Sequence, residues 1–156
     1  MDYLVKQARL VLGVKRLGLL LFDKGYWNLD EYKSLISDQG ENILTPAKKY
    51  RDVKDAISDI PQSEWRKGMF PNERWAETTV TFGKNGLKLR LVVRKLLGWK
   101  KKRKNGKVVK DENDEPIQEA VILYHSYLTN LSEVEIETDQ IVATYATRWG
   151  FFFFLK

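Results

Sequence analysis

The segment at residues 19–22, Leu-Leu-Leu-Phe, constrains the fold of this chain more than any other. A wholly apolar run of this length is too short for a helix, and it is typical of a strand that is buried on both faces of a parallel sheet. Asp23 follows the run directly, and Gly25 stands in the turn after it. We therefore expect an α/β fold with Asp23 at the carboxyl end of a parallel strand.

The neighbouring segments fit such a fold. Apolar residues at helical spacing predict a helix over residues 3–16, which ends or turns at Gly18. A second helix is expected from Asn28, because Asn28 and Glu31 have the spacing of a capping box. Residues 42–45 predict a second strand. This β-α-β order indicates two parallel strands joined by a helix.

The later part of the chain is expected to be rich in β-structure. Residues 47–75 are polar and predict an irregular connector with one short helix. Residues 77–94 predict a hairpin that turns at Asn85-Gly86, since Asn-Gly supplies the positive φ angles of a type I′ turn. Residues 120–128 predict another strand, and a last helix is expected from about residue 140 to the end.

The composition excludes several classes of site. The chain has 27 Lys and Arg against 21 Asp and Glu, which gives a net charge of +6, and it has no cysteine. Disulfides, thiolate metal sites and a cysteine nucleophile are therefore excluded. The single histidine, His125, is interpreted as a strand-surface or packing residue. Because no run approaches the ~20 apolar residues of a membrane span and no secretory signal is recognisable, we expect a soluble cytoplasmic protein without a membrane partner.

The basic segments each admit two interpretations. Strand alternation places Lys88, Arg90 and Arg94 on one face of the hairpin, where they meet water or line a DNA duplex. In one interpretation the basic cluster at residues 100–104 binds phosphates, and Trp99 stacks on a base. In the other, the cluster is a solvated hairpin tip beside a second Asn-Gly pair. The candidate DNA-binding residues are Lys88, Arg90, Arg94, Trp99, Lys100, Lys101, Lys102, Arg103 and Lys104.

Asp23 is the sharpest single candidate for chemistry. Sites of α/β sheets lie at the carboxyl ends of the strands, and hard divalent cations prefer carboxylate oxygens. Asp23 is therefore a candidate ligand of a metal ion. The alternative is that its carboxylate only hydrogen-bonds the turn that it begins, as aspartates often do.

Three segments, in this order, resemble the C-terminal part of an insertion-sequence DDE transposase. They are Leu-Phe-Asp-Lys-Gly-Tyr ending at Tyr26, the run from Tyr124 to Leu131 that contains Thr-Asn, and a helix with Tyr145 and Arg148 three residues apart. The resemblance covers roughly residues 17–154. It implies an incomplete RNase H-like fold, with parallel strands, flanking helices and a β-rich insertion before the last helix. It assigns residues to parts of that fold as follows: 1–46 to the rear of the core, 47–76 to a connector, 77–131 to the insertion and 132–156 to the C-terminal helix.

The resemblance also implies roles for single residues. Asp23 matches the second metal-binding carboxylate of the family, and Tyr145 and Arg148 match the tyrosine and arginine of its helical signature. The glutamate of that signature falls at Phe152, the signature lysine falls beyond the last residue, and the strand with the first aspartate has no counterpart. Intact relatives hold Mg²⁺ or Mn²⁺ with their carboxylates and cut and rejoin DNA. One aspartate cannot hold two such ions, so we expect a fragment that is inactive alone and binds no metal tightly.

The expected partner is DNA, in a bacterial-type cytoplasm and associated with the nucleoid. A full-length transposase or a complementary fragment is a second expected partner, because a sheet that lacks its first strands would be marginally stable and prone to aggregate. Two further interpretations stay open. In the first, the chain is a non-catalytic basic DNA-binding module or a regulator of a full-length transposase. In the second, it is a degraded gene product without a role.

Overall fold

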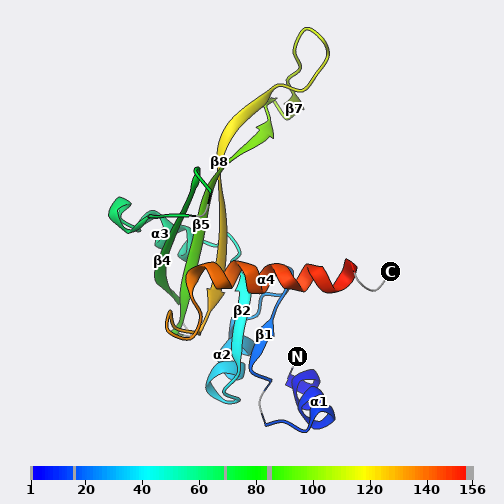
Figure 1. Ribbon diagram of the computed structural model, residues 1–156, viewed down its shortest axis with the longest axis vertical. Helices are drawn as coiled ribbons and strands as arrows, with labels where there is room; N and C mark the ends of the chain where they lie inside the picture. Colours follow the sequence, from blue (N-terminus) through cyan, green and yellow to red (C-terminus); the bar gives the residue numbers. More distant parts are fainter. Residues whose placement is uncertain (1, 16, 69, 84–85, 154–156) are drawn as a thin grey trace.

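A computed structural model describes residues 2–15, 17–68, 70–83 and 86–153, and it describes side chains as far as residue 145 on the last helix (Figure 1). In chain order the elements are α1 (Asp2–Leu12), β1 (Leu19–Leu21), α2 (Leu29–Ser37), β2 (Asn42–Pro46), α3 (Arg51–Ser58), a 3₁₀ turn (Gln62–Glu64), β3 (Arg66–Lys67), β4 (Glu73–Phe82), β5 (Leu87–Lys101), β6 (Arg103–Lys104), β7 (Lys107–Val108), β8 (Gln118–Thr129) and α4 (Thr138–Phe153).

The expected β-α-β unit is present. Strands β1 and β2 are parallel, with Leu20 opposite Ile43. The amide of Glu31 donates to the Asn28 side chain at 3.2 Å, so Asn28 caps α2 as its spacing with Glu31 predicts. Helix α2 buries Tyr32 and Leu35 completely against the sheet. The prediction of two parallel strands joined by a helix is confirmed.

A six-stranded mixed sheet, in the order β1-β2-β8-β5-β4-β3, forms the centre of the described structure. Strand β8 lies between β2 and β5 and runs antiparallel to both, with Thr129 opposite Leu44 on one side and Arg90 on the other. Asn130, at the end of β8, accepts a hydrogen bond from the amide of Ile43 at 2.8 Å. The β-rich segment and the N-terminal β-α-β unit therefore share one continuous sheet.

Several predicted element boundaries are wrong. Helix α1 ends at Leu12 rather than at residue 16, because Gly13 adopts a φ of +65° that closes the helix. The predicted connector contains α3 but also β3 and the first residues of β4, which begins at Glu73. Strand β5 continues to Lys101 instead of ending at residue 94, because β8 supplies a cross-strand partner for each of its later residues. Asn85, the expected first turn residue of the hairpin, lies outside the described residues.

The sheet is covered on both faces. On one face, α1, α2 and α3 pack on a cluster that includes Tyr32, Val53 and Leu91. On the other, α4 packs Ile141 and Tyr145 onto a cluster with Val92, and Figure 1 shows this helix crossing the sheet. Val92 is completely buried, although alternation places it on the face with Arg90 and Arg94. The expectation that this face of the hairpin meets water or DNA is wrong at its centre, because α4 covers it.

Beyond the covered part of the sheet, β5 and β8 continue as a two-stranded arm that ends in the short β6–β7 hairpin (Figure 1). Asn105 and Gly106 at its tip have φ angles of 51° and 78°, as a type I′ turn requires. None of the described helices is long and apolar enough to cross a membrane.

Candidate functional site

A hollow of about 620 Å³ lies where β1 and β2 end, between the sheet and α4. This edge is the one at which α/β sheets with parallel strands place their sites. The hollow is called the strand-end hollow below. It is lined by Asp23, Lys24, Pro46, Ala47, Lys49, Arg94, Tyr124, His125, Ser126, Tyr127, Val142 and Tyr145.

Asp23 reaches this hollow from the end of β1. Buried Phe22 anchors the residue before it, and the Phe22 ring stacks on Tyr26 with 5.1 Å between centroids. The Asp23 carboxylate accepts a hydrogen bond from the amide of Lys24 at 2.6 Å, and its carbonyl accepts one from the amide of Tyr26 at 2.9 Å. Asp23 therefore stabilises its turn, as one interpretation predicts, and it also lies exposed at the hollow, as the other requires.

Tyr145 enters the same hollow from α4. Its side chain is nearly buried, and its ring centroid lies 5.4 Å from that of Tyr127 on β8. Ile141, one turn earlier on α4, is completely buried and holds the helix on the sheet. Two of the three residues that match the transposase signature, Asp23 and Tyr145, thus line one hollow although they are far apart in the sequence. The side chains of Arg148 and of Phe152 lie outside the described residues.

Positive charge surrounds Asp23. Lys24 and Lys49 are exposed at the hollow, and His125 on β8 lies opposite Arg94 on β5. Desolvation by the surrounding protein, and then the charges of Arg94, Lys24 and Lys49, lower the pKa of His125. Burial raises the pKa of the Tyr127 hydroxyl, and the Arg94 charge partly opposes that shift. The strand-end hollow therefore attracts anions and disfavours a further cation.

The sequence alone does not identify Lys49 or His125 as members of this hollow. The position of Lys24 directly after Asp23 is the one local signal for a nearby cation. Lys49 follows β2, and His125 comes from the long strand β8, so only the pairing of β2 with β8 brings them to the end of β1. No spacing within a single segment predicts this meeting.

Arg90 and Arg94, both predicted to contact DNA, have carboxylate partners within the protein. The Arg90 Nε lies 2.6 Å from a Glu77 oxygen, and one Arg90 Nη donates to the Ile136 carbonyl at 2.7 Å. Arg94 forms an ion pair with the almost buried Glu73. Its guanidinium carbon lies 5.7 Å from the centre of the Trp75 ring.

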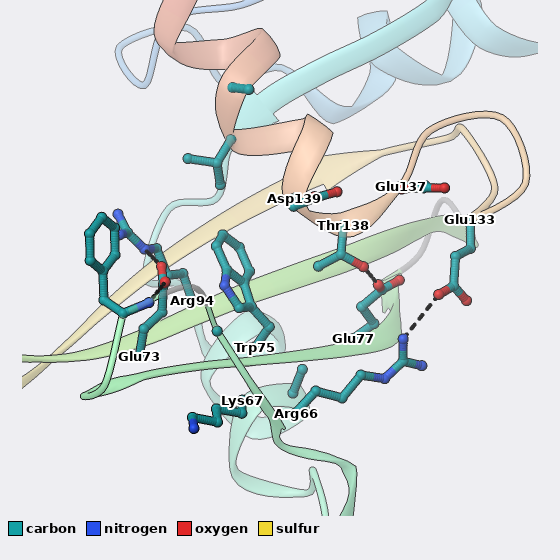
Figure 2. Close-up of a pocket in the computed structure, with 15 residues that line it drawn as sticks. Arg66, Lys67, Glu73, Trp75, Glu77, Arg94, Glu133, Glu137, Thr138 and Asp139 are labelled. Atoms are coloured by element: carbon teal, nitrogen blue, oxygen red, sulfur yellow. Dashed lines mark hydrogen bonds and ion pairs between the residues drawn. The ribbon is translucent and has the colours of Figure 1, made fainter.

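Figure 2 shows Arg94 with Glu73 and Trp75 in a second hollow, also of about 620 Å³, between β3, β4 and the start of α4. The Thr138 hydroxyl donates to Glu77 there, and Arg66 pairs with Glu133 at 3.1 Å. Arg90 therefore fastens the start of α4 and the loop before it to the sheet, whereas Arg94 ties β5 to β4. Lys88, the third basic residue of this strand face, is exposed.

The remaining candidate DNA-binding residues lie on the arm. Trp99 is 64 % exposed, and Lys100 and Lys101 follow it within β5. Lys100 faces Glu119 across the arm at 3.4 Å, a separation at which an exposed pair contributes little. Arg103 and Lys104 form β6, and Lys102 precedes them. The cluster is thus part of a paired ribbon rather than a loop.

The strand-end hollow does not have the donors of a two-metal site. Asp23 is its one carboxylate among the described lining residues, and the other charged groups are cations. A pair of hard divalent ions requires several carboxylate oxygens. Nor are any three His, Cys, Asp or Glu side chains of the described residues placed to hold a metal ion. The Mg²⁺ or Mn²⁺ of the transposase resemblance therefore does not fit the residues present.

Comparison with known proteins finds no matching family model and no similar curated protein.

Proposed function

We propose that this chain is a DNA-binding relative of the catalytic domain of insertion-sequence DDE transposases, with an incomplete RNase H-like fold, and that it does not cut DNA by itself. One observation carries the proposal. Asp23 and Tyr145 match separate parts of the transposase pattern, and they line the same electropositive hollow at the ends of β1 and β2. The sequence pattern places them in order along the chain, but it does not require them to meet.

The chemistry of the hollow supports a phosphate as the bound group. Lys24 and Lys49 supply exposed ammonium groups, and Arg94 and the polar edge of β8 line the wall behind them. Positively charged groups in a partly desolvated hollow attract phosphate oxygens strongly. Tyr145 and Tyr127 provide an apolar wall against which a sugar can lie. Binding of this kind contacts the DNA backbone and carries no base sequence information.

The arm supplies a second place of contact. Its basic residues Lys101, Lys102 and Arg103 extend beyond the sheet, and the exposed Trp99 ring can stack on an unpaired base. We expect the arm to raise affinity for DNA through phosphate contacts that add to those in the hollow.

The small number of carboxylates in the hollow supports the proposed lack of cleavage. DDE transposases transfer phosphodiester bonds with two metal ions. These ions activate the attacking oxygen and stabilise the leaving oxygen. Asp23 alone cannot position such a pair, and the surrounding lysines disfavour a divalent cation. The residues of this chain therefore bind and orient a phosphate, and they supply no group that replaces the metal.

The experiment that tests the proposal is a salt titration of binding to a fluorescent duplex of random sequence, followed by anisotropy. For the variant Lys24→Ala/Lys49→Ala, we expect weaker binding and a salt slope that is smaller by about 1.8, since each lost phosphate contact changes it by about 0.9. The matched control is Lys33→Ala/Lys54→Ala, which removes two exposed lysines elsewhere and the same net charge. An unchanged slope for the first variant would remove the hollow from the DNA interface.

The arm is tested in the same assay with Lys100→Ala/Lys101→Ala/Lys102→Ala. If the arm variant has a smaller salt slope of DNA binding and Lys24→Ala/Lys49→Ala has an unchanged one, the simpler interpretation of a basic DNA-binding module is favoured. Incubation of supercoiled plasmid with Mg²⁺ or Mn²⁺ should give no nicking above buffer. Nicking that disappears in Asp23→Asn would contradict the proposed lack of cleavage.

A further inference from the structure

The single histidine of the chain lies at the strand-end hollow. His125 on β8 is paired directly opposite Arg94 on β5. Directly opposite residues of an antiparallel pair point to the same face of the sheet, with Cβ atoms about 4.5–5.5 Å apart. The His125 ring and the Arg94 side chain are therefore neighbours on the face of the sheet that carries α4.

Two lysines from other segments approach the same ring. Lys24 lies in the turn after β1, and Lys49 follows β2, whose pairing with β8 holds that segment beside His125. Desolvation lowers the pKa of His125 most, and the charges of Arg94 and of both lysines lower it further. Cationic side chains from three separate segments thus act on one titratable ring.

The other groups at the hollow do not cancel this positive charge. Asp23 is the one carboxylate among the described residues that line it. The remaining titratable side chains there are phenols, which are uncharged near neutral pH. They are Tyr124, Tyr127 and Tyr145. With Arg94 and Glu73 counted as an ion pair, the two lysines exceed Asp23 by one positive charge, and protonation of the histidine adds a second.

A phosphate in the hollow reverses the electrostatic environment of the His125 ring. Without an anion, desolvation and the neighbouring cations lower its pKa, so the ring is predominantly neutral at pH 7. A phosphate bound between Lys24 and Lys49 places negative charge beside the ring, which favours the protonated form. The protonated ring then donates an N–H group to a phosphate oxygen, in a charge-assisted hydrogen bond. Phosphate binding and protonation of the ring therefore favour each other.

We propose that His125 is a phosphate-binding residue of the strand-end hollow, and that it takes up a proton from solvent when a DNA phosphate binds there. This role rests on the proposed function, because it adds a ligand and a proton to the same hollow. Affinity for DNA should rise as the pH falls, since the ring is then protonated before the DNA binds. A phosphodiester keeps its single negative charge over this range, so His125 is the group that carries the dependence.

The first test is an NMR titration of the ring. Because the chain has a single histidine, one signal reports the protonation of His125. The signal is followed from about pH 5.5 to 7.5, on either side of the usual pKa of an imidazole, in the free protein and with a short random duplex that has no terminal phosphates. We expect the DNA to raise the pKa of His125, both in the wild type and in the arm variant. Without DNA, Lys24→Ala/Lys49→Ala should also raise it, because two of the charges that lower it are gone.

The second test is the affinity for the same duplex, followed by anisotropy at about pH 7.5 and about pH 5.5. The wild type should bind up to about tenfold more tightly at the lower pH, the effect of one hydrogen bond to a charged group. Its salt slope should also be larger by about 0.9 at the lower pH, since the protonated ring contacts a further phosphate charge. His125→Gln should show neither change. His125→Lys, which is charged at both pH values, should keep the larger slope at both.

A pKa of His125 that DNA leaves unchanged would overturn this role. So would an equal increase in affinity at low pH for the wild type and His125→Gln, because other groups would then cause it. The titration of the wild type does not depend on the folding of any variant. The proposed function fails separately, when Lys24→Ala/Lys49→Ala binds DNA with an unchanged salt slope at the higher pH. A smaller slope in that variant, with no change in the pKa of His125, would leave the proposed function standing and remove His125 from the phosphate site.

Discussion

The ion pair between Arg9 and Glu41 should be a major contributor to the stability of the N-terminal half. Glu41 is completely buried at the start of β2, and its carboxylate accepts from the Arg9 Nε at 2.8 Å and from the amide of Leu17 at 3.0 and 3.1 Å. An Arg9→Met substitution keeps the apolar stem and removes the charge. Glu41 would then remain buried with one amide donor. Breaking a buried pair in this way costs about 3–5 kcal/mol.

The assay is thermal and urea unfolding followed by circular dichroism. For a domain of this size, the loss corresponds to a fall in Tm of about 6–20 °C, at about 2–4 °C per kcal/mol. Arg9→Met/Glu41→Met should recover about half of that loss and leave a deficit of about 1–3 kcal/mol for the unpaired Leu17 amide. The control is Arg51→Met, whose side chain is 91 % exposed and pairs with the exposed Asp55, and it should change nothing measurable. If Arg9→Met behaved like this control, the pair would not hold α1 on the sheet.

Three further substitutions test other parts of the fold. Asn28→Ala removes the cap of α2 and should cost about 1 kcal/mol in urea unfolding, so no change would mean that the cap is dispensable. Leu91→Ala opens a cavity at a completely buried position of β5 and should cost about 2–5 kcal/mol, and a smaller loss would show that the core there collapses. The pKa of His125 is lowered in the folded state, so the unfolded chain takes up the proton first and Tm should fall as the pH drops below about 6.5. His125→Gln should flatten that decline, and an equal decline in both proteins would assign it to other groups.

The sequence predicts the local units of this fold well. The apolar run before Asp23 and the Asn28 capping pattern depend on neighbouring residues, and both the parallel pair and the helix between its strands are found. The sequence does not predict that β8 lies between β2 and β5, because pairing of distant strands leaves no local pattern. The alternation that separates Arg90 from Leu91 identifies two faces of a strand. It carries no information on which helix covers each face, so the burial of Val92 beneath α4 was missed.

Charge distribution is equally hard to predict from the sequence. The two hollows on either side of Arg94 differ in the sign of their charge, and no local pattern predicts that difference. Arg94 lines both, but its carboxylate partner Glu73 lies in the second hollow, together with Glu77, Glu133, Glu137 and Asp139. The strand-end hollow keeps Lys24 and Lys49 against a single carboxylate, Asp23. The second hollow is therefore acidic, whereas the strand-end hollow has two exposed lysines against one carboxylate. A small anion is therefore expected at the ends of β1 and β2 rather than in the acidic hollow at the start of α4, which is the charge distribution that the proposed binding of a phosphate requires.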